Sequence, residues 1–211
     1  MEKSQIKAYT MVYKLFNENT IIAPLKCGTR YLERVFGEPT SEIASYTLKK
    51  NLFIQTLKTI IIRPPMEHLF SALHTEILGF LRENKEGDIQ EVLKTFITNN
   101  AIDSLQNTHW DKNIYSDLYW YWRRNRDYVN VVELNNLSSH LKGLKIKKLP
   151  KYDSKEYDFN HYDYWCSKDD LMLFIKTSYR REWDNLIEQV GVSTIFYDYL
   201  INKEVIEIKL I

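Results

Sequence analysis

Two short apolar runs, each followed by a helical pattern, constrain the fold of this chain more than any other feature. Residues 20–25 lead through a glycine-containing loop into residues 31–36, whose apolar side chains recur at helical spacing until Gly37. Residues 57–62 form the second run, and residues 64–65 are prolines suited to the first turn of a helix. Continuous apolar strands are typical of a parallel sheet buried on both faces. The pattern predicts two successive strand–loop–helix units.

The remaining patterns extend this α/β prediction to the whole chain. We expect residues 9–16 to pair with the first run as a hairpin, and residues 128–134 to form another strand. Two further stretches, residues 88–107 and 167–190, are expected to be helical, the latter with Ser167 as N-cap and Gly191 as its stop. The length of 211 residues suits a single domain, residues 1–211. The predicted fold is a P-loop-like three-layer sandwich with a mostly parallel central sheet flanked by helices.

Charge and cysteine content exclude several classes of protein. The chain carries 29 basic and 28 acidic side chains, so no global field favours nucleic acid or an anionic membrane, and an anion site must be local. Two cysteines, Cys27 and Cys166, are too few for a disulfide framework or a cysteine-rich zinc site. The five histidines are scattered without metal-binding spacing, and no metal is expected. The start of the chain lacks an apolar signal region, and no window approaches the roughly 18 apolar residues of a membrane span, so a cytoplasmic protein is expected.

The first candidate site is Lys26-Cys27-Gly28-Thr29, at the first strand-to-helix junction. A phosphate or phosphosulfate there would meet backbone N–H groups and the positive end of a helix dipole, while Lys26 adds a point charge and Gly28 permits close approach. The order differs from that of the nucleoside-triphosphate loop, in which the lysine follows the glycines. A simple glycine turn with Thr29 as helix N-cap explains the same four residues. The junction is therefore a candidate anion site, and kinase and ATPase interpretations lose support.

The second candidate site is the next strand-to-helix junction, with the sequence RPPMEHLFS at residues 63–71. Arg63 follows the strand, and Ser71 lies about two turns into the helix, so a guanidinium fork and a hydroxyl could converge on one phosphate. An arginine paired to a carboxylate and an ordinary helix serine explain these residues equally well when the motif stands alone. The two junctions together, each after a buried strand, favour a shared site at the carboxyl edge of the sheet.

These motifs resemble those of the sulfotransferase family, particularly its carbohydrate-type enzymes and their short microbial and viral relatives. Residues 26–29 match the family's K-x-G-T loop for the 5′-phosphosulfate of 3′-phosphoadenosine 5′-phosphosulfate (PAPS). Residues 63–71 are similar to its 3′-phosphate motif R-x-P-x-x-R-x-x-S. Residues 108–110, which include His109, resemble the His-Trp segment of the carbohydrate group, and residues 131–137 resemble its strand with a Glu-x-Leu signature. The similarity covers roughly residues 20–141.

The resemblance implies a metal-independent enzyme in which an acceptor hydroxyl or amine attacks the sulfur of PAPS in line while 3′-phosphoadenosine 5′-phosphate leaves. The residues that it implies for donor binding are Lys26, Cys27, Gly28, Thr29, Arg30, Arg63 and Ser71. Lys26 and its neighbouring amides would stabilise the charge that grows on the leaving phosphate. His68 stands where the family usually has a second arginine, and Pro64 where an acidic, amide or histidine residue is common, so the contacts near the 3′-phosphate are expected to differ.

The base that accepts the acceptor's proton must be a histidine or a carboxylate. The candidates are His109, His74, His68, Glu33, Glu42 and Glu76. The match to the His-Trp segment favours His109. The sequence leaves the oligomeric state open, and also the acceptor: a sugar hydroxyl, amino sugar, lipid, small phenol or peptide tyrosine. Two other functions stay open, a module that binds the nucleotide or another anion without turnover and a P-loop nucleotide kinase.

Overall fold

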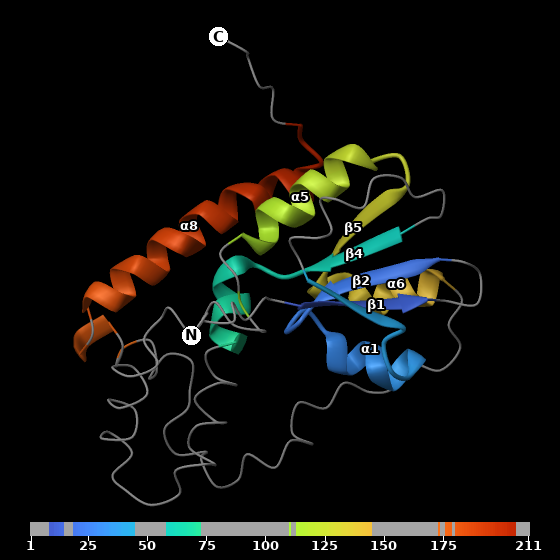
Figure 1. Cartoon of the computed structure of the whole chain (residues 1–211), viewed down its shortest axis with the longest axis horizontal. Coiled ribbons are helices and arrows are strands. Elements are labelled where there is room, and N and C mark those ends of the chain that lie inside the picture. Colours follow the sequence, from blue (N-terminus) through green and yellow to red (C-terminus); the bar gives the residue numbers. More distant parts are fainter. Residues whose placement is uncertain are drawn as a thin grey trace, which may run out of the picture.

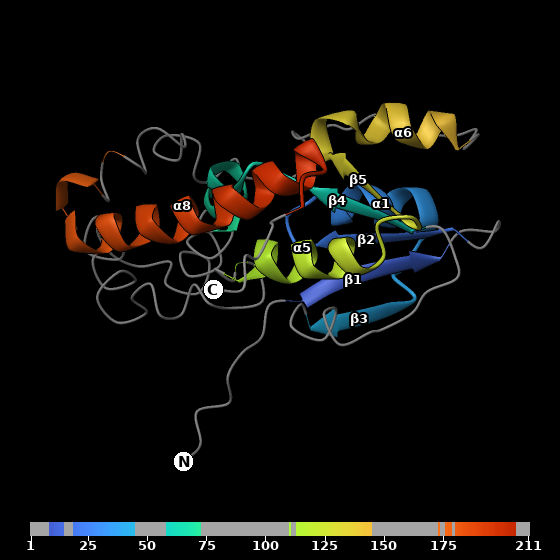
Figure 2. The same cartoon turned by 90° about the horizontal axis from the view of Figure 1, so that it is seen from above.

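The computed structural model describes residues 9–14, 19–44, 58–72, 110, 113–144, 173, 176–178 and 180–205. Within these ranges the chain forms a five-stranded sheet in the order β3-β1-β2-β4-β5, with helices on both faces (Figures 1 and 2). The strands are β1 Tyr9–Lys14, β2 Thr20–Pro24, β3 Ser41–Ala44, β4 Lys58–Ile62 and β5 Val129–Glu133.

The pairing of the strands confirms the predicted α/β class with a mostly parallel sheet. β4 lies between β2 and β5 and is parallel to both, as expected for two successive strand–helix–strand units. β1 is antiparallel to β2, with Lys14 opposite Thr20, which confirms the predicted hairpin. β3 pairs antiparallel with β1 at the outer edge, so β1 alone opposes the direction of the other strands. β3 was not predicted, because its four residues include two polar ones and show no strong apolar pattern.

The apolar run in β4 explains why helices cover both faces of the sheet. Ile60 and Ile62 belong to one core cluster and Ile61 to the other, and all three are fully buried. Successive side chains of a strand point to opposite faces, so three consecutive isoleucines can be buried only if both faces are covered. β4 is therefore a central strand with a core on each side.

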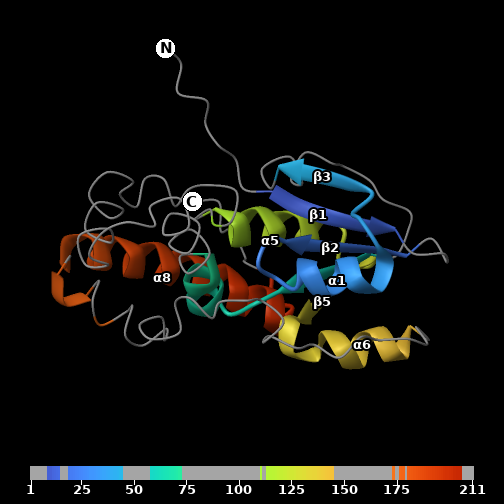
Figure 3. The same cartoon turned by 90° about the horizontal axis from the view of Figure 1, so that it is seen from below.

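Helices cover each face of the sheet. α1 Thr29–Phe36 and α6 Leu137–Gly143 cover the face of Ile61. α5 Ile114–Arg124 and α8 Arg180–Asn202 cover the opposite face and pack against each other (Figures 1 and 3). Helical residues 65–72 lie on this second face, where Leu69 and Phe70 join its core. The aromatic residues around Tyr119 in α5 are core residues, as predicted, and they contact the aromatic side chains of α8.

The helix boundaries test the glycine signals in the sequence. α1 ends as predicted at Gly37, whose φ is 81° and whose N–H donates to the Glu33 carbonyl over 2.7 Å. The prediction that Gly191 ends the last helix is wrong, because α8 continues to Asn202. Ser193 and Leu200, beyond that glycine, are fully buried, and such packing outweighs the roughly 1 kcal/mol cost of a glycine inside a helix. The predicted N-cap Ser167 and the predicted helix at residues 88–107 lie outside the described residues.

A membrane-spanning helix is absent from the part of the chain that the structure describes, where no helix is both long and apolar enough to cross a bilayer.

Candidate functional site

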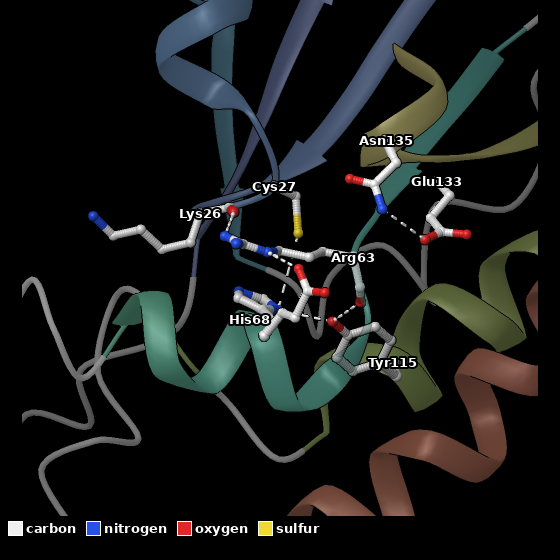
Figure 4. Close-up of polar contacts among 8 residues, drawn as sticks. Lys26, Cys27, Arg63, His68, Tyr115, Glu133 and Asn135 are labelled. Carbon is white, nitrogen blue, oxygen red and sulfur yellow. Dashed lines mark hydrogen bonds and ion pairs between the residues drawn. The ribbon is translucent and has the colours of Figure 1, made fainter. Parts of the chain in front are cut away.

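The two motifs singled out in the sequence meet at one edge of the sheet. β2 ends at Pro24 and β4 at Ile62, and these parallel neighbours present their carboxyl ends side by side. Arg63, the first residue after β4, donates a hydrogen bond through Nη1 to the carbonyl oxygen of Lys26 over 3.3 Å (Figure 4). Segments 37 residues apart in the sequence thus form one candidate site.

The loop after β2 is a tight turn that holds Lys26 in an unusual conformation. The N–H of Cys27 donates to the Pro24 carbonyl over 3.0 Å and closes the turn. Lys26 has a φ of 67°, in the left-handed region, which costs a residue with a side chain about 1–2 kcal/mol. Residues held in this way cluster at functional sites. Its side chain extends away from Arg63 and His68 in Figure 4.

Gly28, rather than Thr29, is the N-cap of α1. Its φ of 83° favours glycine, and an added Cβ would lie 2.6 Å from the Leu134 side chain. The first-turn N–H groups of a helix have no acceptor within it, so the amides that begin at Gly28 give this end of α1 a partial positive charge. The Cys27 amide, also expected to face an anion, instead donates within the turn.

The second motif places a carboxylate next to its arginine. Arg63 Nε donates to Glu67 over 3.3 Å, and with the bond to Lys26 this occupies two of the five guanidinium N–H groups. Glu67 and Ser71 are four residues apart on the helix and share a face. Arg63 is thus paired to a carboxylate in this structure, which is the simpler of the two interpretations of the motif. The i,i+4 spacing of Arg63 and Glu67 is a signal that the sequence analysis did not use.

His68 is not an accessible base, because its side chain is fully buried and both ring nitrogens have partners. Its Nε2 donates to the Leu25 carbonyl over 2.8 Å, and its Nδ1 lies 2.9 Å from the Tyr115 hydroxyl. The Tyr115 hydroxyl in turn donates to the Arg63 carbonyl over 2.6 Å. Through these bonds His68 and Tyr115, the latter from α5, connect the segments that follow β2 and β4 (Figure 4). Tyr115 lies 47 residues from His68, and nothing in the sequence pointed to it.

Cys27 does not act as a nucleophile in this arrangement. Its Sγ lies 3.9 Å from His68 Nδ1, a pairing found in enzymes with catalytic cysteines. Complete burial raises the pKa of the thiol to about 12, although the Arg63 charge acts in the opposite direction. A buried thiol with a raised pKa is inert near neutral pH. Cys27 therefore serves as a packing residue under the loop.

A third strand end contributes a carboxylate. Glu133 is the last residue of β5, in register with Ile62, and it accepts a hydrogen bond from Asn135 Nδ2 over 3.4 Å. Burial, then the negative charge of Glu133 and a hydrogen bond to it, raise the pKa of Tyr197 on α8 to about 12, so this phenol stays protonated and donates to the carboxylate. The position of Glu133 at the end of a predicted strand could have identified it, whereas Tyr197 had no sequence signal.

The other expected bases are not brought to this edge by described contacts. Glu33 lies exposed on α1, where its charge acts on Tyr13 of β1. Glu42 is on β3, which β1 and β2 separate from β4. His74, Glu76 and His109 lie outside the described residues, although Trp110, next to His109, is fully buried with its ring centroid 5.2 Å from that of His68.

The described residues contain no group of three or more histidine, cysteine, aspartate or glutamate side chains that could hold a metal ion. Comparison of the chain with protein-family models, with curated proteins and with solved structures gave no match.

Proposed function

We propose that this chain is a sulfotransferase that moves a sulfuryl group from PAPS to the hydroxyl or amine of an acceptor such as a carbohydrate. The contact between Arg63 and Lys26 is the observation that carries the proposal, because it joins the two anion-binding motifs at one sheet edge. A P-loop-like three-layer sandwich, in which such edges bind nucleotides, is part of the proposal.

In the proposed reaction, the acceptor oxygen or nitrogen forms a bond to sulfur while the bond between sulfur and the 5′-phosphate oxygen breaks. The electron pair of that bond goes to the departing 3′-phosphoadenosine 5′-phosphate. Lys26 and the first-turn amides of Gly28, Thr29 and Arg30 stabilise this charge, and preorganised donors of this kind are worth about 3 kcal/mol each in the barrier. The left-handed conformation of Lys26 fixes the direction in which its side chain leaves the loop.

The 3′-phosphate is held by Arg63 and Ser71 in this proposal. The guanidinium has three N–H groups beyond its two described bonds, enough for a forked contact with phosphate. Glu67 opposes the binding of an anion, since its carboxylate competes for the same guanidinium. Nucleotide binding therefore exchanges a carboxylate partner of Arg63 for a phosphate, or adds the phosphate beside it.

Two groups are candidates for the base that takes the acceptor's proton. His109 follows from the resemblance. Glu133 follows from the edge itself, because it ends the strand next to β4 and is oriented by Tyr197 and Asn135. A carboxylate that two donors hold in place can accept the proton of the acceptor in the transition state.

A binding module without turnover is the second candidate function. The ion pair between Arg63 and Glu67, and the commitment of His68 to the interior, are the observations that favour it. Both describe an edge with less accessible positive charge than the motifs alone suggest.

Thermal unfolding with three nucleotides tests the proposal. Ligand binding stabilises the folded state by RT ln(1 + [L]/Kd), about 2.7 kcal/mol at a hundredfold excess over Kd. We expect 3′-phosphoadenosine 5′-phosphate to raise the melting temperature more than adenosine 5′-phosphate, and more than ATP with Mg²⁺. Sulfate transfer from PAPS to any acceptor in a mixed panel then separates the enzyme from the binding module. A preference for ATP would support a nucleotide kinase and contradict the proposal.

A further inference from the structure

The network around His68 allows its hydrogens to be counted. The Leu25 carbonyl can only accept a hydrogen bond, so the hydrogen on His68 Nε2 points at it over 2.8 Å. The Arg63 carbonyl can also only accept, so the single hydrogen of the Tyr115 hydroxyl points at it over 2.6 Å. The Tyr115 oxygen then faces His68 Nδ1, 2.9 Å away, with lone pairs alone. A hydrogen bond at this distance requires a second hydrogen, on Nδ1.

We propose that His68 is a buried imidazolium and a positioning residue, which ties the Lys26 loop to Arg63 and adds a positive charge beneath the anion site. Its value to donor binding rests on the proposed function, whereas its charge state follows from the hydrogen count alone. His68 has no exposed surface, so it cannot contact a bound nucleotide directly. It acts by holding the loop after β2 and the Tyr115 side chain in place.

A neutral ring satisfies the contacts less well. If Nδ1 carried no hydrogen, one of two contacts would lack a hydrogen. Either the Nδ1 lone pair would face the lone pairs of the Tyr115 oxygen at 2.9 Å, or the Tyr115 hydrogen would turn to Nδ1 and leave its oxygen against the Arg63 carbonyl oxygen at 2.6 Å. The Cys27 thiol could donate to Nδ1, but over 3.9 Å and from a weak donor, and it would not relieve that opposition. A phenolate at Tyr115 is disfavoured because burial raises its pKa well above the ordinary value. The doubly protonated ring alone satisfies all three oxygen atoms.

The surroundings of the ring contain charges of both signs. Lys26 and Arg63 oppose a third cation, and Glu67, paired with Arg63, offsets part of this repulsion. Cys27, Tyr115 and Tyr197 contribute no charge near neutral pH, since burial raises the pKa of each. The Trp110 ring centroid lies 5.2 Å from that of His68, within the range of attraction between a cation and an indole. A phosphate bound at the edge would add negative charge near the ring, so ligand binding and protonation of His68 favour each other.

Nitrogen NMR of the full chain labelled with 15N-histidine tests the charge without any ligand. At pH 7.5 an ordinary histidine is mostly neutral. We expect one of the five histidines to keep hydrogens on both ring nitrogens at this pH, and to lose this signature in Tyr115→Phe. A single neutral tautomer for all five at pH 7.5 would overturn the proposal.

Tyr121→Phe is the matched control, because Tyr121 lies on the same helix and its buried hydroxyl has no hydrogen-bond partner among the described residues. Tyr115→Phe should weaken binding of 3′-phosphoadenosine 5′-phosphate roughly tenfold, through loss of a hydrogen bond in a charged network, and Tyr121→Phe should not. If Tyr115→Phe keeps wild-type affinity in a chain that binds the nucleotide, the positioning role is wrong. A protonated His68 in a chain that binds no nucleotide would instead refute the proposed function and leave the charge assignment standing.

Discussion

At the scale of single residues, two lysines with left-handed backbone conformations allow the catalytic role proposed for Lys26 to be tested against a control. Lys203, after α8, also has a positive φ, 56°. Replacement of either residue by glycine relieves backbone strain, so Lys26→Gly and Lys203→Gly should both keep or slightly raise the melting temperature. Lys26→Gly should lower kcat by about 10²–10³, whereas Lys203→Gly should not change it. Steady-state rates with a working acceptor measure these effects. Normal turnover in Lys26→Gly would contradict a role of the loop in catalysis.

Glu67 is the residue whose removal should improve binding. Its carboxylate pairs with Arg63 at 3.3 Å and is about half exposed. Because exposed ion pairs are worth up to about 1 kcal/mol, Glu67→Gln should tighten binding of 3′-phosphoadenosine 5′-phosphate by roughly two- to fivefold. Adenosine 5′-phosphate, which lacks the 3′-phosphate, should bind as before. Glu188→Gln, at an exposed carboxylate two and a half turns before Tyr197, is the control for a change in net charge. Weaker binding in Glu67→Gln would mean that the ion pair supports the site.

The two candidate bases make opposite predictions for paired variants. If Glu133 is the base, Glu133→Gln should leave nucleotide affinity nearly intact and lower kcat by about 10²–10⁴, and His109→Ala should have little effect on kcat. If His109 is the base, the results reverse. Nucleotide titrations and initial rates on the same preparations distinguish these outcomes. Losses of melting temperature without losses of kcat in both variants would exclude both residues from the mechanism.

At the scale of elements, the sequence predicted strands well where burial on both faces removes ambiguity. β2 and β4 are short, buried apolar runs next to turn signals, and they lie within a residue or two of their predicted positions. The edge strand β5, in which burial is less uniform, was predicted equally closely from its three valines. β3 was missed because an edge strand needs no apolar run, and the sequence of β3, SEIA, has one β-branched residue where β5 has three. Gly191 misled the prediction of α8, because a local stop signal is weaker than the contacts of the following turns with α5.

Gly191 therefore offers a test of what holds α8 together. It is exposed in the helix interior, and an added Cβ would meet nothing within 4 Å. Gly191→Ala should stabilise the protein by about 0.5–1 kcal/mol, the difference in helix propensity. Gly28→Ala is the contrasting variant, because its φ of 83° and its approach to Leu134 predict destabilisation. Urea unfolding of both variants measures these changes, and a loss of stability in Gly191→Ala would contradict a continuous helix.

At the scale of the whole molecule, the sequence predicted which strand ends meet at the candidate site but not what supports them. Parallel neighbours must present their carboxyl ends at one edge, so the meeting of Lys26 and Arg63 follows from topology. One partner of His68, Tyr115, comes from α5, and one partner of Glu133, Tyr197, comes from α8. Such contacts depend on how helices pack across the sheet, and no local pattern encodes them.

The acid sensitivity of the whole fold provides the last prediction, through His140 on α6. Its Nε2 lies 3.2 Å from the Thr59 hydroxyl of β4, and burial lowers the pKa of the ring below its ordinary value of 6.5. The unfolded chain then binds more protons at this site than the folded chain, so the contribution of His140 to stability is present above pH 6.5 and declines as the pH falls.

His140→Gln keeps a polar side chain opposite Thr59 and cannot titrate. The free energy of unfolding should therefore fall less steeply from pH 7 to pH 5 in His140→Gln than in the wild type. Urea unfolding at several pH values measures both curves, and their difference isolates His140 because the other titrating groups are shared. A cationic His68 contributes with the opposite sign, but equally to both proteins. Parallel curves would mean that α6 leaves the His140 ring in contact with water, and would contradict its burial against the sheet.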